Sequence, residues 1–393
     1  MRKGWEYKKL GEVCTLISDG SHNPPKGIDH SLYRMISSQN VFDDNLQITE
    51  DNVRYITETD HLCENKRTKL QKDVVLLTIV GTIGRSCVLK GNEGCLTLQR
   101  SVAALHPSDQ IMPRYLMHCL IGNRHTLNQE AHGIAQKGIY LKQLSSLSVP
   151  LPPKSTQLAI VSELDKINEL IRLKKEQLKD FDNLAQSLFY EMFGDPVENE
   201  KGWEVKKLKE IVSDNCSISY GIVQPGDGVE NGVPVVRPVD MTKTFVSRKG
   251  LKNTTKEISD SYKRTILKGN EILMCVRGTT GLISMATPEL QGCNVTRGIA
   301  PIECGPTCDK WFVFYQILNP AIQHHIAEYT RGIALKQINM KDVRDIPLCL
   351  PPLSLQRFFA QRIEQIEREK SEVQKSIQDL ETLLASRMQY WFE

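Results

Sequence analysis

The feature that most constrains the fold is an internal repeat that runs through the whole chain. The segment that begins Gly4-Trp5-Glu6 returns 198 residues later as Gly202-Trp203-Glu204. Gly81-Thr82-Ile83-Gly84 returns as Gly278-Thr279-Thr280-Gly281, and Leu151-Pro152-Pro153 returns as Leu350-Pro351-Pro352. A nearly constant shift of this length is too long for a solenoid repeat. It predicts a duplicated pair of domains within the 393 residues.

Each half divides again where the sequence pattern changes, just after its Leu-Pro-Pro segment. The preceding residues are rich in Gly, Pro, Thr and short apolar runs, which is typical of short strands between turns. Strands are expected at 74–80, 100–105 and 271–276, and helices near 113–122 and 309–329. We therefore expect an α+β fold with globular units at 1–152 and 202–352, followed by long helices at 153–201 and 353–393.

The two long helices carry apolar residues spaced alternately four and three apart, which is the seam of a coiled coil. A helix of about 38 residues would be about 57 Å long. The simplest partner for each seam is the other helix of the chain, paired antiparallel with approximate two-fold symmetry. Packing of each helix on its own globular unit is the alternative. The expected seam is Ile160, Leu164, Ile167, Ile171, Leu178, Phe181 and Leu188 in the first helix, and Phe359, Ile363, Ile366, Val373, Ile377, Leu380 and Leu384 in the second.

The charges follow the same division. The chain carries a formal net charge of only +3, which argues against a strongly cationic nucleic-acid binder. The segments 1–152 and 201–352, which hold the globular units, are nevertheless basic, with net charges of +3 and +5. The helical segments are net acidic. This pattern is expected if the globular units contact phosphate and the helices contact protein.

No catalytic or metal-binding motif is recognisable. Asn23-Pro24-Pro25 resembles the Asn-Pro-Pro-aromatic motif of adenine methyltransferases, but Lys26 stands at the aromatic position. The Gly81–Gly84 segment lacks the Gly-Lys-Ser/Thr of a phosphate-binding loop and is interpreted as a turn at the end of a strand. Cys304 and Cys308 form the only close cysteine pair, so no zinc site is expected.

The order of globular unit, Leu-Pro-Pro-x-x-x-Gln and long helix, occurring twice, resembles the specificity (S) subunit of type I restriction–modification systems. Further similar segments are Asp19–Pro25, 219–226, the two Gly-Thr-x-Gly turns, and Gly133-Ile134-Ala135-Gln136 with Gly332-Ile333-Ala334-Leu335. Thr156 and Leu355 depart from the acidic residue that often precedes the glutamine in the family.

The resemblance implies a non-catalytic subunit with two target-recognition domains, each reading one half of an asymmetric, bipartite double-stranded DNA target. The paired helices would set the spacing of the half-sites and dock two methyltransferase (M) subunits. Restriction (R) subunits would then join the complex. S-adenosylmethionine, ATP and Mg²⁺ would be bound only by these partner subunits, so no cofactor is expected on this chain.

Polar and basic side chains on the expected turns and loops are candidates for contact with DNA, because these residue types read bases and bind phosphates. Gln157 and Gln356 are instead expected to organise the start of each long helix. The candidates are Ser21, His22, Asn23, Lys26, Arg34, Gln39, Asn40, Arg85, Gln136 and Lys137 in the first globular unit, and Tyr220, Gln224, Arg237, Lys243, Arg248, Arg277, Arg297, Arg331 and Lys336 in the second.

Two other functions remain open from the sequence. One is a specificity subunit of another restriction class, whose partner fuses methylation and cleavage. The other is a coiled-coil protein scaffold that does not bind DNA. The eleven cysteines, the absence of an apolar leader and the short apolar runs predict a cytoplasmic protein with mostly buried thiols and no membrane contact.

Overall fold

The computed structural model describes residues 4–132, 137–332 and 335–392. The chain forms two compact units, which are described separately. Unit 1 comprises Met1–Lys175 and Lys375–Glu393, and unit 2 comprises Glu176–Gln374. Each unit therefore contains one globular part, half of the first long helix and half of the second.

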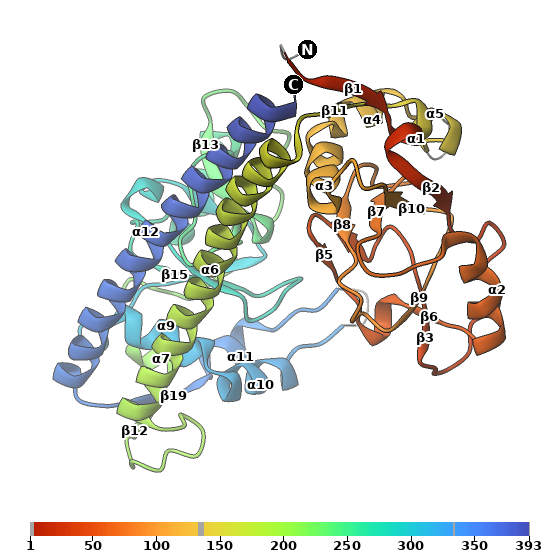
Figure 1. Ribbon diagram of the computed structural model, residues 1–393. Helices are drawn as coiled ribbons and strands as arrows, with labels where there is room; N and C mark the ends of the chain where they lie inside the picture. Colours follow the sequence, from red (N-terminus) through yellow and green to blue (C-terminus); the bar gives the residue numbers. More distant parts are fainter. Residues whose placement is uncertain (1–3, 133–136, 333–334, 393) are drawn as a thin grey trace. The chain divides into compact units, whose positions relative to one another are not determined.

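Unit 1 is built on a four-stranded sheet in the order β2-β10-β7-β8 (Figure 1). A second sheet, in the order β6-β3-β9, contains one parallel pair, β3 with β9. Its strands are β1 (Glu6–Lys9), β2 (Cys14–Asp19), β3 (Tyr33–Ile36), β4 (Val41–Phe42), β5 (Asn45–Leu46), β6 (Arg54–Tyr55), β7 (Val75–Thr78), β8 (Ser86–Val88), β9 (Cys95–Leu98), β10 (Val102–Pro107) and β11 (Ser148–Leu151). Its helices before the spacer are α1 (Leu10–Val13), α2 (Glu58–Thr68), α3 (Pro113–Gly122), α4 (Arg124–Gln129) and α5 (Leu141–Ser146).

Unit 2 repeats this topology. The order β16-β15-β18 matches β8-β7-β10, and β14-β13-β17 matches β6-β3-β9, again with one parallel pair. A bridge between Val212 and Cys304 stands where unit 1 has β2. The strands are β12 (Glu204–Lys207), β13 (Val233–Val236), β14 (Lys252–Thr254), β15 (Ile272–Cys275), β16 (Ile283–Met285), β17 (Asn294–Val295), β18 (Ile299–Ile302) and β19 (Pro347–Leu350). The helices are α7 (Leu208–Ile211), α8 (Lys256–Asp260), α9 (Lys310–Leu318), α10 (Pro320–Glu328) and α11 (Met340–Arg344). The predicted duplication is confirmed at the level of strand order.

The apolar runs that predicted strands form the buried centre of each sheet. All four residues of β7 and all four of β15 are buried, because the sheet is covered on both faces. The predicted helix at 113–122 is α3. The prediction of a single helix at 309–329 is wrong, because the segment forms two helices, α9 and α10. Asn319 leaves the helical conformation and caps the second helix, whose first residue is Pro320. Proline fits the first turn of a helix and cannot continue the preceding one.

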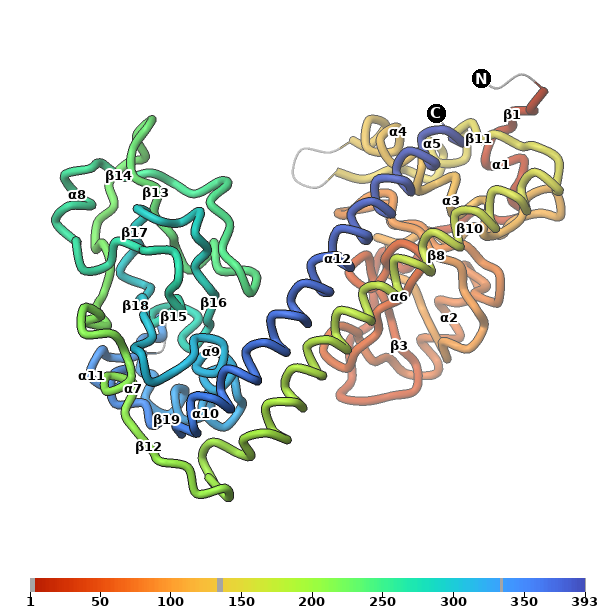
Figure 2. Tube along the Cα trace, turned by 90° about the vertical axis from the view of Figure 1, so that its left-hand side faces the viewer, coloured from red at the N-terminus to blue at the C-terminus, as the bar shows by residue number. Residues whose placement is uncertain are grey.

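The long helices are α6 (Lys154–Phe193) and α12 (Leu353–Phe392), each 40 residues long. They begin within two residues of the predicted starts. Within each unit they run antiparallel and side by side (Figures 1 and 2). In unit 1, Lys175 Nζ lies 2.8 Å from Glu381 Oε1. In unit 2, Lys370 Nζ lies 2.7 Å from Asp182 Oδ1.

Every predicted seam residue is buried or half-buried. Ile160, Leu164, Phe359 and Ile363 are fully buried. The sequence missed Phe189 and Phe193, which are 2% and 3% exposed and pack edge-on against Phe359. At this end of α6 the helix meets α9 as well as α12, so its buried face is wider than a two-helix seam. The helices therefore pack on each other and on the globular part, which combines the two predicted alternatives.

Gln157 and Gln356 confirm their predicted role at the helix starts. Both are fully buried. Gln157 Oε1 accepts the backbone N–H of Met112 at 2.9 Å, and Gln356 Oε1 accepts that of Asp309 at 2.9 Å. Each side-chain amide donates back to the Leu-Pro-Pro segment, to Pro152 and Pro351 respectively. The same side chain thus joins the start of the long helix to the start of α3 or α9 in both units.

Candidate nucleic-acid interface

The two Gly-Thr-x-Gly segments are tight turns that follow a buried strand in each unit. The N–H of Gly84 donates to the carbonyl of Thr78, and the N–H of Gly281 donates to that of Cys275, both at 2.9 Å. Both glycines have positive φ angles, +88° and +86°, which favour glycine. The interpretation of residues 81–84 as a turn at the end of a strand is confirmed.

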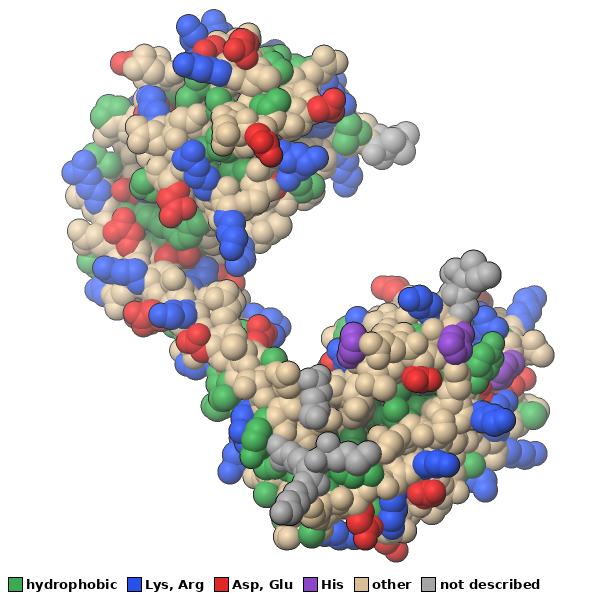
Figure 3. Space-filling view, turned by 90° about the horizontal axis from the view of Figure 1, so that it is seen from above, with side chains coloured by type: hydrophobic (Ala, Val, Ile, Leu, Met, Phe, Trp, Pro, Cys, Tyr) green, Lys and Arg blue, Asp and Glu red, His purple; other side chains and the backbone are tan. Residues whose placement is uncertain are grey.

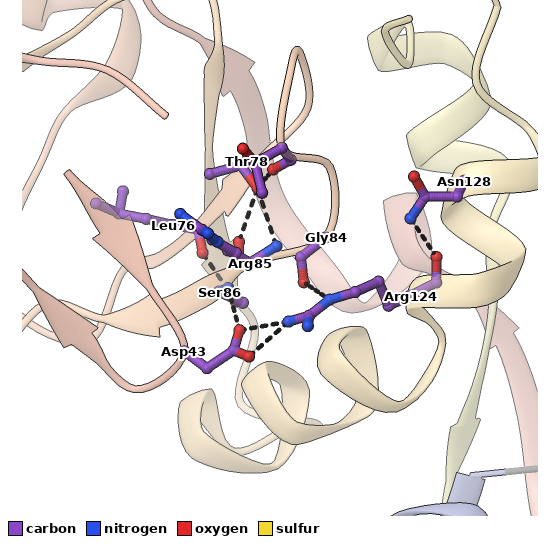
Figure 4. A network of polar contacts seen from close by, with 9 residues as sticks. Asp43, Leu76, Thr78, Gly84, Arg85, Ser86, Arg124 and Asn128 are labelled. Atoms are coloured by element: carbon purple, nitrogen blue, oxygen red, sulfur yellow. Dashed lines mark hydrogen bonds and ion pairs between the residues drawn. The ribbon is translucent and has the colours of Figure 1, made fainter. Parts of the chain in front are cut away.

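A side chain from α4 in unit 1, and from α10 in unit 2, donates a hydrogen bond to each turn. In unit 1, Arg124 Nε donates to the carbonyl of Gly84 at 3.1 Å, and its Nη2 binds both carboxylate oxygens of Asp43 at 2.5 and 2.6 Å (Figure 4). In unit 2, Gln323 Nε2 donates to the carbonyl of Gly281 at 2.9 Å. The same turn is therefore fixed by a charged contact in unit 1 and by a neutral one in unit 2.

A second segment approaches the end of strand β9 in unit 1, and of β17 in unit 2, through a glycine that has no room for a side chain. A Cβ on Gly20 would lie 2.1 Å from the carbonyl oxygen of Leu98, and one on Gly221 would lie 2.1 Å from that of Val295. The close approach lets Ser21 N–H reach the Leu98 carbonyl at 2.8 Å. In unit 2, Ile222 N–H reaches Val295 in the same way at 2.8 Å.

A pocket lies at the same place in each unit, lined by residues next to these segments, such as Val80 and His22 in unit 1 and Arg277 and Val223 in unit 2. The pocket of unit 1 has a volume of about 460 Å³, and its polar lining comes from Asp19, His22, Arg67, Arg100 and His132. The pocket of unit 2 has a volume of about 250 Å³ and is lined by Tyr220, Val223, Arg277, Arg297 and Gln337. Arg100 and Arg297 occupy corresponding turns, since their N–H groups donate to Ser21 and Ile222 respectively.

The two pockets differ in charge. In unit 1 the buried carboxylate of Asp19 pairs with the guanidinium of Arg67 and with His22 Nε2, which lies 2.7 Å away. The pocket of unit 2 contains two arginines, and no Asp or Glu lines it among the residues that the structure describes. Arginine is the side chain that most often contacts guanine bidentately, and it also binds phosphate. The duplicated site thus offers two chemically different surfaces to a polyanion.

The predicted candidates fall into three groups. Those that are exposed are His22, Asn23, Lys26, Gln39 and Lys137 in unit 1, and Gln224, Lys243, Arg248, Arg331 and Lys336 in unit 2. Those that are half-buried are Arg34, Arg85, Tyr220, Arg237, Arg277 and Arg297. Ser21 and Asn40 are buried. Gln136, with the rest of the segment 133–136, lies outside the described residues. For the exposed and half-buried residues, contact with DNA stays a prediction.

Two candidates are corrected because burial removes them from solvent. Asn40 is fully buried, and its amide donates to the carbonyls of Gln47 and Asn52 while its oxygen accepts from Ser37. Ser21 is 5% exposed and serves through its backbone. Both residues stabilise the conformation of their loops through hydrogen bonds to the backbone. An asparagine in a turn has this second use, because its amide can replace backbone hydrogen bonds.

Two further candidates have guanidinium groups that are already engaged. Arg34 donates to the backbone carbonyl of Glu93. Arg237 binds Asp240 through Nε at 3.0 Å and Nη2 at 2.8 Å, and this ion pair raises the pKa of the arginine. These contacts orient both side chains along the protein surface.

Arg67, Arg100 and Gln337 also line the two pockets and are not among the candidates predicted from the sequence. Arg100 could have been predicted from the internal repeat, because a shift of 197 residues aligns it with the candidate Arg297. Arg67 has no such signal, since it comes from α2 and reaches the pocket only through the tertiary fold.

Charges of both signs are interspersed on the faces of the two units shown in Figure 3. The basic character of the globular segments is therefore spread over the surface in this view. Among the described residues, no group of three or more His, Cys, Asp or Glu side chains is arranged to hold a metal ion. Nor does any described helix have the length and apolarity needed to cross a membrane.

The cysteines are free thiols in the structure. Most are buried, as predicted, and burial raises the pKa of Cys14, Cys87 and Cys119 to about 12. Cys216 and Cys304 are half-buried, and Cys63 and Cys95 are exposed.

Comparison with known proteins places these features in a family. The model of the type I restriction modification DNA specificity domain matches residues 2–180 and 200–382. The chain is 23% identical over 310 residues to the type I restriction enzyme EcoBI specificity subunit of Escherichia coli, in an alignment that covers 73% of this chain and 65% of that protein. It is 23% identical over 412 residues to the putative type I restriction enzyme MjaX specificity subunit of Methanocaldococcus jannaschii, covering 97% of this chain and 92% of that protein.

Solved structures show the same fold at lower sequence identity. A chain from a study of complex assembly and conformational transition in a type I R-M system aligns with a TM-score of 0.57 and 17% identity, covering 100% of this chain and 98% of that one. The S subunit of a type I restriction-modification system from M. genitalium aligns with a TM-score of 0.55 and 14% identity, covering 99% and 96%. Because the family model matches both halves of the repeat, the chain belongs to the type I restriction modification DNA specificity family.

Proposed function

We propose that this chain is the subunit that selects the DNA target of a type I restriction–modification complex, and that each unit reads one half of a bipartite sequence. The observation that carries the proposal is the duplicated pocket beside the Gly-Thr-x-Gly turns. Both copies present an arginine at the same turn, Arg100 and Arg297, yet their neighbouring side chains differ. Two related but unequal surfaces fit an asymmetric target with two different half-sites.

The long helices would then dock two methyltransferase subunits, which bind S-adenosylmethionine and methylate adenine, and restriction subunits would join that complex. Support for a protein partner comes from the apolar side chains that α6 leaves exposed. Leu158, Leu170, Leu173 and Leu184 are each 46–57% exposed and lie outside the buried seam of the helix. The chain itself would bind no cofactor and would work in the cytoplasm, where the DNA is.

The test is to purify the complex with its methyltransferase subunits and to map methylated adenines at single-base resolution. Arg297→Ala should weaken or relax recognition in one half of the target, and Arg100→Ala should do so in the other half. A base contact should relax one position at a cost of about 1–3 kcal/mol, whereas a phosphate contact should weaken binding to all sequences and reduce the salt dependence.

Arg368→Ala is the matched control, because Arg368 is an exposed arginine on α12 outside both pockets. Methylation irrespective of sequence would contradict the proposal. Binding that does not weaken between low and high salt would favour the scaffold function, because phosphate contacts release counterions. A partner chain that fuses methylation and cleavage would assign the subunit to another restriction class.

A further inference from the structure

A series of ion pairs and hydrogen bonds in unit 1 connects the spacer helix α6, through two adjacent aspartates, to the Gly81–Gly84 turn. It starts at Asp165 on α6. Arg114 on α3 binds Asp165 through Nε at 2.6 Å and Nη2 at 2.7 Å. The same guanidinium binds Asp44 through Nη1 and Nη2, both at 2.9 Å. One arginine is therefore shared by two carboxylates, one from the spacer helix and one from the β4–β5 hairpin.

The next contacts in the series are made by Asp43, the neighbour of Asp44 in the hairpin. Asp43 binds Arg124 Nη2, and Arg124 Nε donates to the carbonyl of Gly84 (Figure 4). The hairpin is also tied to the strand that leaves the turn, since Asp44 N–H donates to the carbonyl of Ser86 at 2.9 Å. Asp43 and Asp44 thus face two different arginines from two successive positions.

The backbone conformation of the hairpin helps this geometry. Asp44 has a φ of +58°, a left-handed conformation that aspartate tolerates better than most non-glycine residues. The contact at the spacer helix is partly shielded from water. His118 is 1% exposed, and its Nε2 lies 2.7 Å from Asp165 Oδ1. Burial of Asp165 opposes ionisation, but the hydrogen bonds from His118 and Arg114 outweigh it, and the pKa of Asp165 is lowered.

Unit 2 makes the corresponding contacts without this ionic series. Trp311, the second residue of α9 as Arg114 is of α3, packs edge-on against Phe245 with ring centroids 5.7 Å apart. Phe245 bridges to Met285 of β16, so it lies beside the strand that corresponds to β8. The turn itself is held by the neutral amide of Gln323. The duplication therefore preserved the position of the contact and changed its chemistry.

We propose that Arg114 and Arg124, through the paired carboxylates of Asp44 and Asp43, are positioning residues that set the Gly81–Gly84 turn according to the position of α6. An arginine shared between two carboxylates has a fixed fork geometry, so movement of Asp165 with its helix changes the support of the hairpin. Among the described residues, Asp43 of the hairpin is the only one whose side chain pairs with Arg124. In unit 2 the aromatic contact lacks this directionality.

The test is amide hydrogen exchange of the full chain, read at the turn. The reporting amides are those of Gly84, which donates to Thr78 O, and Arg85, which donates to Thr78 Oγ1. Asp165→Asn keeps the size of the side chain and removes its charge. We expect it to increase exchange at both amides by about 2- to 30-fold, the range of energetic coupling between residues that do not touch.

Three comparisons make the result specific. In the background of Arg124→Gln, which copies Gln323 of unit 2, Asp165→Asn should change exchange at Gly84 by a smaller factor. The amide of Leu89, at the far end of the same hairpin of strands, reports general opening of the sheet. The amide of Gly281 in unit 2 should not respond. The proposal would be overturned if Asp165→Asn changed exchange at Gly84 by the same factor with and without Arg124→Gln, or if it left exchange at Gly84 unchanged.

A second variant tests the same contact in case the Asp165→Asn protein does not fold. Arg114→Lys keeps the positive charge but cannot bind two carboxylates in the same fork, so it should have the same effect on Gly84. The consequence for DNA rests on the proposed function. In the complex with methyltransferase subunits, Asp165→Asn should reduce discrimination in one half-site only, and Gln323→Ala should affect only the other. If no sequence specificity is found, the exchange measurement still decides the positioning role.

Discussion

The packing of α12 on α6 in unit 2 can be tested at one pair of adjacent phenylalanines. Phe359 is fully buried, and its ring meets those of Phe189, Phe193 and Tyr315 edge-on at 5.4–5.7 Å. Truncation of a buried phenylalanine to alanine costs about 3–5 kcal/mol, a range that includes the cavity and the lost ring contacts. Alanine returns roughly 0.5 kcal/mol of helix propensity. We expect Phe359→Ala to destabilise unit 2 by about 3–4 kcal/mol.

Phe358→Ala is the control, because it makes the same substitution one residue earlier on the same helix. Phe358 is 49% exposed, and the Arg362 guanidinium lies 5.3 Å from its ring centroid. An exposed cation–π contact is worth about 0.5–1 kcal/mol, which the gain in helix propensity largely offsets. Its stability should therefore change little.

The assay is urea unfolding followed by circular dichroism and tryptophan fluorescence. Phe359→Ala should lower the urea midpoint without changing the slope, since the surface exposed on unfolding stays the same. For a unit of this size the loss corresponds to a fall in Tm of roughly 6–16 °C. A loss below about 1 kcal/mol, or equal losses for the two variants, would refute the packing of α12 against α6 described here.

Three further outcomes are expected. Ile167→Asp combined with Ile366→Asp places charges at two buried seam positions, so methylation mapping should show that the preference for half-site spacing is lost; an unaltered preference would contradict the paired-helix arrangement. Alkylation of the native protein followed by mass spectrometry should label Cys63 and Cys95 first, and early labelling of the buried thiols would argue against the fold. The lowered pKa of Asp165 stabilises the folded state above about pH 4 and this contribution is lost as the pH falls through the folded value, so the stability gap to Asp165→Asn should shrink on acidification in denaturant titrations.

The architecture follows from features that are visible in the amino-acid sequence alone. The repeat predicted two related units, the Leu-Pro-Pro segments marked the start of both long helices, and the spacing of apolar residues identified the buried face of each helix. These features are local or periodic, so a single sequence displays them directly. The roles of Gln157 and Gln356 were predicted for the same reason, since both stand at a fixed distance from a helix start.

Which side chains contact each other depends on the three-dimensional packing and cannot be predicted from the sequence. Asn40 and Lys26 are both polar residues on expected loops, yet one is buried and hydrogen-bonded inside its loop and the other faces solvent. Arg67 reaches the pocket of unit 1 across 48 residues of sequence. The series from Asp165 to Gly84 joins five separate segments, and no spacing in the sequence encodes it. Polar side chains have several possible partners, and the choice among them depends on the long-range packing that brings one partner within hydrogen-bonding distance.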